Sequence, residues 1–279
     1  MSADVLRIDL LHPVVSGNKW FKLKYHLNEA LQRRSEGIIT FGGAFSNHLV
    51  ATAWAAREAG LAAIGVIRGE EPKHYSPALQ DMIDYGMQLK FVNRAQFADE
   101  ETLQKKIAQE FPQYFMVPMG GQSKLGVKGA AEILPLADGR KYSHIICAVG
   151  TGTMMAGLLQ AAAPHQQVIG ISALKVSAIE NNTIESFIAE NNPGKAFRLV
   201  YDYHFGGYAR HTPALLQFMN RLYEEQGIPT DFVYTAKLLF AVDHLVQNGH
   251  FPPGSSLLII HSGGLQGNRS LAPGTLTFQ

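Results

Sequence analysis

The chain has 279 residues, of which 46% are hydrophobic and 17% are charged, so it can bury the core of one large domain or of two moderate ones. Its formal net charge is +1 and it has no long run of Lys or Arg, so we expect a small-molecule ligand and no nucleic-acid partner. No apolar run could span a bilayer, and the first residues do not resemble a signal peptide. We therefore expect a cytoplasmic protein with no membrane partner.

Short apolar runs alternate with helical periodicity along the whole chain, which is typical of an α/β protein with mostly parallel sheets. We predict strands, with helices between most of them, at 38–41, 63–67, 89–92, 145–149, 168–171 and 257–260. The only cysteine, Cys147, lies in one of these runs and is expected to be a core residue.

The Gly-rich segment 118–126 is the expected crossing between two domains. On this basis residues 1–44 and 119–279 form a larger, discontinuous domain, and residues 45–118 form a smaller α/β domain.

The first segment with chemical character is Ser16-Gly17-Asn18-Lys19, which precedes apolar residues at helical spacing. We expect Asn18 to cap this helix and Lys19 to lie in its first turn. There the helix dipole and partial desolvation lower the pKa of an amine, and a neutral amine can attack an aldehyde. The alternative is a solvated lysine, as we expect for Lys22 and Lys24.

Ser46-Asn47-His48 follows a strand and a Gly-Gly turn, and precedes a second helical pattern. Its backbone N–H groups and hydroxyl would lie at a helix start, where they can bind a substrate carboxylate. The alternative is that Ser46 only caps the helix and that His48 is a surface residue.

A Gly/Thr loop lies between the strand that ends at Val149 and the next helix, and it consists of Gly150, Thr151, Gly152, Thr153 and Met154. Strand, loop and helix start together form a typical phosphate cradle. The loop lacks the Walker lysine and the dinucleotide spacing, which favours a lone phosphate over ATP or NAD. The alternative is an ordinary tight turn.

Three further side chains could serve this site. Tyr208 follows Gly206-Gly207, and Tyr234 lies in Phe232-Val233-Tyr234-Thr235, which is expected to be a strand end, so either phenol could stack or move a proton. Ser262 follows the last strand beside two glycines, at the sheet edge where ligands bind in α/β proteins. The alternative for both phenols is simple packing.

An aldehyde-binding lysine, a phosphate cradle and a hydroxyl for a ring nitrogen together describe a site for pyridoxal 5′-phosphate. The motifs Ser-Gly-Asn-Lys, Gly-Gly-x-x-Ser-Asn-His, Gly-Gly-Gln-Ser-x-x-Gly, Gly-Thr-Gly-Thr-x-x-Ala-Gly, Val-Tyr-Thr and Ile-His-Ser-Gly-Gly occur in this order between about residues 7 and 264. This pattern resembles the 1-aminocyclopropane-1-carboxylate deaminase/D-cysteine desulfhydrase family. The resemblance implies fold type II, also called tryptophan-synthase-β-like: two open, mostly parallel sheets flanked by helices, with the cofactor in the cleft between the domains. It also implies a homodimer.

Residue by residue, the resemblance makes Lys19 the Schiff-base lysine and Asn47 the partner of the cofactor's 3-hydroxyl. Ser262 would face the pyridine nitrogen. The phosphate would be held, mostly through backbone N–H groups, by Gly150, Thr151, Gly152, Thr153 and Met154. The substrate would be met by Ser46, Asn47, His48, Tyr208 and Tyr234.

The implied reaction is β-elimination from a small amino acid, with D-cysteine giving pyruvate, ammonia and sulfide. A tyrosine pKa near 10 makes Lys19 the expected base and Tyr234 the expected proton donor or orienter. Thr235 and His48 stand where ring-opening deaminases carry glutamate and glutamine, which argues against ring opening. Alternatives left open are ring opening to 2-oxobutanoate and ammonia, a lyase for another amino acid, a catalytically silent cofactor binder, and a nucleotide-binding protein.

Overall fold

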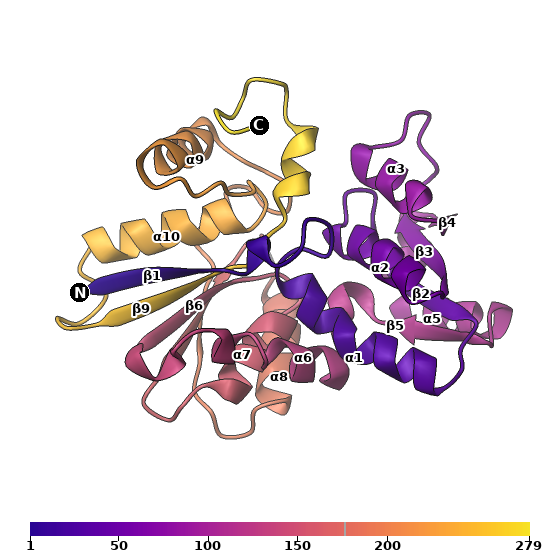
Figure 1. Cartoon of the computed structure of the whole chain (residues 1–279), viewed down its shortest axis with the longest axis horizontal. Coiled ribbons are helices and arrows are strands. Elements are labelled where there is room, and N and C mark those ends of the chain that lie inside the picture. Colours follow the sequence, from indigo (N-terminus) through magenta and orange to yellow (C-terminus); the bar gives the residue numbers. More distant parts are fainter. Residues whose placement is uncertain (176) are drawn as a thin grey trace.

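The protein consists of two open parallel sheets, seen in a computed structural model that describes residues 1–175 and 177–279 (Figure 1). The larger sheet has the order β1-β9-β6-β7-β8, and its strands are β1 (Ser2–Arg7), β6 (His144–Val149), β7 (Gln167–Ser172), β8 (Arg198–Val200) and β9 (Ser256–His261). The smaller sheet has the order β4-β3-β2-β5, formed by β2 (Gly37–Gly43), β3 (Ala62–Arg68), β4 (Met87–Val92) and β5 (Tyr114–Val117). All six predicted strands are confirmed.

Helices cover both faces of the larger sheet, and its inner strand β6 is therefore buried on each side. Ile145 and Cys147 pack toward one set of helices, α6 (Lys124–Ala130), α7 (Thr153–Ala161) and α8 (Ala178–Glu190). Ile146 and Ala148 pack toward the other set, α9 (Pro213–Gln226) and α10 (Thr235–Gln247). Cys147 is a core residue as predicted, and burial raises its pKa to about 12.

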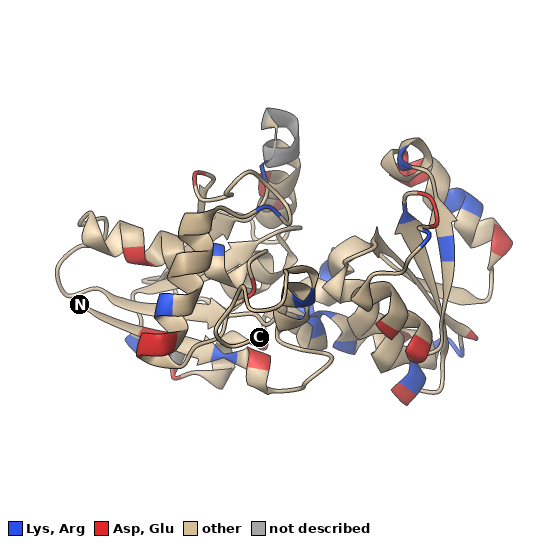
Figure 2. Ribbon diagram, turned by 90° about the horizontal axis from the view of Figure 1, so that it is seen from above, with Lys and Arg blue, Asp and Glu red and all other residues tan. Residues whose placement is uncertain are grey.

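The smaller sheet is covered in the same way. On one face lie α2 (Asn47–Glu58) and α3 (Pro77–Asp84), and on the other lie α4 (Arg94–Ala98) and α5 (Glu100–Glu110). Acidic and basic residues are interspersed on both parts of the molecule (Figure 2).

The predicted domain boundary needs one correction. Residues 37–43 were assigned to the larger domain, but β2 pairs with β3 and β5 and is an inner strand of the smaller sheet. A buried parallel strand looks the same in either sheet, so its local sequence does not say which sheet it joins. The limits of the two domains are otherwise still a prediction.

The helix α1 (Asn18–Gln32) lies between the two sheets. Its Leu23 and Ala30 pack against residues of the smaller part, whereas Phe21 packs into the core of the larger part. The backbone of α6 lies so close that a Cβ on Gly129 would overlap the carbonyl of Phe21. Lys19 and Lys22 are therefore held at the junction. Within the described ranges, no helix is both long and apolar enough to cross a membrane.

Candidate active site

Lys19 lies in the first turn of α1, as predicted, but the predicted cap is wrong. The helix begins at Asn18, and its cap is Gly17, which has a φ of 61°. Asn18 instead accepts a hydrogen bond from Lys19 Nζ through Oδ1 at 2.7 Å, and its backbone N–H donates to the Ser262 carbonyl at 3.4 Å. The lysine turn is therefore held against the end of β9.

Burial lowers the pKa of Lys19 to about 8, although the nearby Asp231 carboxylate opposes this shift. The structure thus attributes the predicted decrease chiefly to desolvation. A substantial fraction of this amine is neutral at mildly alkaline pH, which is the form that attacks a carbonyl carbon.

Lys22 is a candidate site residue that the sequence did not reveal. It was expected to be solvated, yet it is only 6% exposed, and its pKa is lowered to about 7 by burial and by repulsion from Lys19. No hydrogen bond or ion pair joins its ammonium to the residues that the structure describes. A buried cation without a partner is suited to binding an anion. Lys24 is exposed and pairs with Glu132, as an ordinary helix lysine does.

The Ser46-Asn47-His48 turn begins α2. Ser46 caps the helix, because its Oγ accepts from the Leu49 N–H at 3.3 Å. Among the described residues, the N–H groups of Asn47 and His48 have no acceptor. Two free N–H groups at a helix start can bind a carboxylate. The Asn47 side chain lies beside Gly264, where a Cβ would be 3.1 Å from its Nδ2.

His48 is not a surface residue, since it is 4% exposed. Thr40 Oγ1 donates to the Val117 carbonyl at 2.9 Å, so it accepts from His48 Nε2, 3.0 Å away. This assignment leaves His48 Nδ1 as a buried acceptor without a partner. Burial, then repulsion from Lys19 and Lys22, holds the pKa of His48 well below its usual value, so the imidazole is neutral.

The Gly/Thr loop has the features of an anion cradle. No acceptor is found, within the part of the chain that the structure describes, for the N–H groups of residues 151–154, and these groups lie at the start of α7. Gln122 fixes the loop by donating from Nε2 to the Thr151 carbonyl at 3.0 Å. Gln122 was missed as a positioning residue, although it lies within the Gly-Gly-Gln-Ser motif.

The two phenols pack against each other. The rings of Tyr208 and Tyr234 have centroids 6.1 Å apart and an interplanar angle of 65°. A Cβ on Gly150 would lie 3.3 Å from the Tyr234 hydroxyl, so this ring covers the start of the loop. Desolvation of the hydroxyl raises the pKa of each phenol, although the Tyr208 side chain as a whole is 47% exposed, and the Asp231 charge adds to both shifts. Tyr208 also raises the pKa of Tyr234. Both phenols are therefore protonated at neutral pH and can donate a proton.

Asp231, also missed from the sequence, orders this region. It is fully buried, and its carboxylate accepts from the N–H groups of Val233, Tyr234 and Thr235, each at 2.9 Å. It also accepts from Thr235 Oγ1 at 2.7 Å. An Asp shortly before a helical pattern is a capping signal that could have indicated this role.

Glycine contacts bring several of the predicted residues close together. Gly17 touches Ser262, Gly264 lies between Asn47 and Asp231, and Gly121 lies beside both Lys22 and His48. Ser262 is 6% exposed, and its hydroxyl has no hydrogen bond to any described residue.

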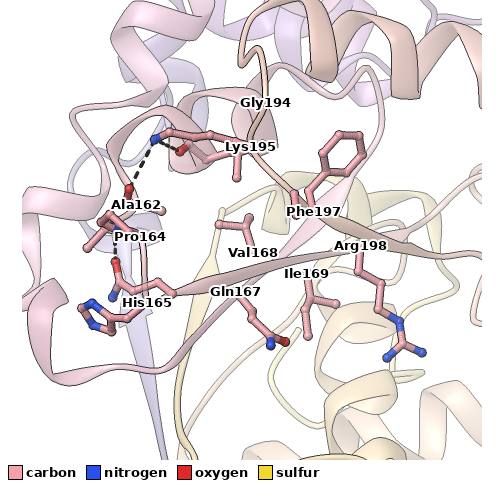
Figure 3. A pocket seen from close by; sticks show the side chains of 14 residues that line it. Ala162, Pro164, His165, Gln167, Val168, Ile169, Gly194, Lys195, Phe197 and Arg198 are labelled. Atoms are coloured by element: carbon pink, nitrogen blue, oxygen red, sulfur yellow. Dashed lines mark hydrogen bonds between the residues drawn. The ribbon is translucent and has the colours of Figure 1, made fainter.

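A separate cavity of about 620 Å³ is lined by Ala162, His165, Phe197 and Arg198 among others (Figure 3). None of the predicted site residues lines this cavity.

These groups fit a phosphorylated aldehyde that has a ring. The amines of Lys19 and Lys22 have lowered pKa values, the N–H groups of residues 151–154 are free to bind a phosphate, and the Ser262 hydroxyl and His48 Nδ1 have no hydrogen-bond partner among the described residues. The model of the family described as pyridoxal-phosphate dependent enzyme matches residues 5–263. The chain therefore belongs to the family of pyridoxal-phosphate-dependent enzymes, which confirms the predicted cofactor.

Its relatives lie in the branch that the sequence motifs indicated. The chain is 29% identical to a Pyrococcus horikoshii protein that is named provisionally as a 1-aminocyclopropane-1-carboxylate deaminase, over 96% of this chain and 86% of that protein. It is 24% identical to the bifunctional D-cysteine desulfhydrase/1-aminocyclopropane-1-carboxylate deaminase of Arabidopsis thaliana, over 94% and 72%. The crystal structure of an ACC deaminase homologue matches with a TM-score of 0.83 and 27% identity, over 95% and 85%. Fold type II is thus confirmed.

Proposed function

We propose that this enzyme eliminates the β-substituent of a small amino acid, with D-cysteine as its substrate and pyruvate, ammonia and hydrogen sulfide as its products. One observation carries the choice of substrate: the residue after Tyr234 is Thr235, which is fully buried and hydrogen-bonded to Asp231. Ring-opening members of the family that this sequence resembles carry a glutamate there. This chain offers no carboxylate at that position to assist ring opening.

The cofactor, when bound, supplies an aldehyde that captures the substrate amine and a ring that accepts the electron pair left at the α-carbon. Lys19 would hold the aldehyde and, once released, remove the α-proton, because its lowered pKa leaves part of the amine neutral. Its Nζ is oriented by Asn18. Lys22 and the N–H groups of residues 151–154 would hold the phosphate, and the Ser262 hydroxyl would meet the ring nitrogen.

The substrate carboxylate would bind at the start of α2, through the N–H groups of Asn47 and His48 and the hydroxyl of Ser46. Tyr208 and Tyr234 keep their protons at neutral pH, so either could protonate the departing sulfur as the C–S bond breaks. One water completes the balance: cysteine and water give pyruvate, ammonia and hydrogen sulfide.

Ring opening of 1-aminocyclopropane-1-carboxylate to 2-oxobutanoate and ammonia is the second candidate. It is favoured by the names of the Pyrococcus and Arabidopsis relatives. The homodimer and the cytoplasmic location are still predictions.

A comparison of three substrates tests the proposal. The cofactor-loaded protein is incubated separately with D-cysteine, L-cysteine and 1-aminocyclopropane-1-carboxylate, and sulfide, pyruvate and 2-oxobutanoate are measured. We expect sulfide and pyruvate in equal amounts from D-cysteine, and no product with Lys19→Ala. Release of 2-oxobutanoate as the main activity would instead support the ring-opening candidate.

A further inference from the structure

The loop that carries Tyr208 has an unusual backbone. Phe205 and Ala209 have φ values of 50° and 52°, and Gly206 and Gly207 between them have 94° and 116°. Positive φ is costly for residues that have a Cβ, and such conformations persist only where surrounding contacts enforce them. Some contact must therefore hold this loop in place.

One such contact comes from Lys237, in the first turn of α10. Its side chain is fully buried, and its ammonium donates to the Gly207 carbonyl at 2.7 Å and to the Ala173 carbonyl, beyond the end of β7, at 3.1 Å. Burial lowers the pKa of Lys237 to about 8, while Asp231 opposes the shift. A buried ammonium is retained only where its hydrogen bonds compensate for desolvation.

The same helix fixes the other phenol. Tyr234 is the cap of α10, and Lys237 follows it by three residues. Tyr208, which is 47% exposed, has no hydrogen bond from its hydroxyl to any described residue. Its place opposite Tyr234 thus depends on its backbone, and the neighbouring Gly207 carbonyl is the group that Lys237 holds.

We propose that Lys237 is a positioning residue, whose buried ammonium holds the loop at 205–209 so that Tyr208 faces Tyr234 at the substrate site. The inference rests on the proposed function, in which Tyr208 meets the substrate.

A kinetic cycle tests whether Lys237 acts through Tyr208. Lys237→Met, Tyr208→Phe and the double variant are assayed with D-cysteine as holoenzymes. We expect each single variant to lower kcat/KM by roughly ten- to a hundredfold, since small displacements at a reacting centre have effects of this size. The double variant should be little worse than the poorer single variant. Losses that multiply in the double variant would overturn the proposal.

The matched control is Lys195→Met. Lys195 also donates to backbone carbonyls, those of Leu159, Gln160 and Ala162, but it lies at the separate cavity shown in Figure 3. The Lys195→Met substitution should leave kcat/KM unchanged, and Tyr208→Phe should lower kcat/KM by the same factor with or without it. An equal loss in Lys195→Met would indicate general destabilisation and would overturn the positioning role.

Trypsin gives a readout that needs no substrate. Arg210 is exposed and follows the loop, so release of the loop should speed cleavage after it by roughly tenfold in Lys237→Met and not in Lys195→Met. An unchanged rate in a folded Lys237→Met would contradict the proposal. If wild type released no sulfide, the proposed function would fail, while the trypsin result would still decide the role of Lys237.

Hydrogen exchange of the wild-type holoenzyme covers the case in which Lys237→Met does not fold. The N–H groups of Gly207 and Arg210 donate to the carbonyls of His204 and Gly207. A held loop should protect both amides as well as amides of the last turn of α10. Exchange at the rate of an unstructured peptide would show that Lys237 does not hold the loop.

Discussion

The Cα of Gly17 lies against the carbonyl of Ser262, so closely that any Cβ at residue 17 would overlap the Ser262 carbonyl oxygen. This contact joins the turn that carries Lys19 to the end of β9, and therefore brings the amine proposed to bind an aldehyde toward the hydroxyl proposed to meet the ring. These two segments are more than 200 residues apart in sequence, and they lie in contact because residue 17 has no Cβ.

Gly17→Ala should separate these segments. The substitution adds both the overlap and a strained positive φ of 61°, so we expect a loss of about 2 to 4 kcal/mol in unfolding free energy and a loss of cofactor binding. The control is Gly60→Ala, where φ is 69° but no atom lies within 4 Å of the new Cβ. Denaturant unfolding of both variants isolates the contact. Equal losses in the two would show that the Ser262 contact is unimportant.

Lys22→Met should raise stability and weaken cofactor binding together. The pKa of Lys22 is lowered from 10.5 to about 7, so protonation of this amine destabilises the folded apoprotein. The destabilisation grows as the pH falls below 10.5 and is complete below about 7. At pH 6 we expect Lys22→Met to have a higher melting temperature than wild type without cofactor, but a Kd for the cofactor roughly ten- to a hundredfold weaker. Lys24→Met, at an exposed position on the same helix, should change neither quantity. An unchanged Kd in Lys22→Met would show that Lys22 does not bind the cofactor.

Asp231→Asn should lower the pKa of Lys19 below its value of about 8, because the Asp231 charge raises that pKa. The rate at which the apoprotein captures the cofactor, followed by absorbance against pH, reports the neutral fraction of the amine. Its midpoint should move to lower pH. Asp243→Asn, on the exposed side of α10, serves as the control and should leave the midpoint in place. An upward shift in Asp231→Asn would contradict this electrostatic account.

Asp9 should make stability fall at acid pH. Burial favours protonation of this carboxyl, but His261 at 2.9 Å and Arg7 at 2.7 Å outweigh burial and lower its pKa to about 2. A carboxylate with a lowered folded pKa stabilises the fold above its unfolded value of 3.8, and this contribution is lost as the pH falls toward about 2. Urea unfolding between pH 5 and 3.5 should therefore show a smaller loss in Asp9→Asn than in wild type. Parallel losses would indicate that other carboxylates dominate.

The motifs were sufficient for the class of enzyme, and the apolar runs were sufficient for the six strands β2, β3, β4, β6, β7 and β9. They were not sufficient for β1, which is half exposed along the sheet edge, or for the short β5 and β8. The burial of Lys22, which is expected from sequence to be solvated, results from packing between α1, α2 and the Gly121 segment. The same packing buries His48, for which the sequence left a surface position open as the alternative. Such contacts depend on the packing of the two sheets against α1, and local sequence periodicity does not predict that packing.

Borohydride reduction of the cofactor-loaded protein, followed by peptide mass analysis, tests the central claim most directly. In the part of the chain that the structure describes, three lysines have lowered pKa values: Lys19 and Lys237 at about 8, and Lys22 at about 7. The lowered pKa values alone therefore do not select among them, and we propose Lys19 because its turn lies against Ser262 at the end of β9. We predict that the reduced cofactor is found on Lys19 alone. Its presence on Lys22 or Lys237, or on no lysine, would contradict the account.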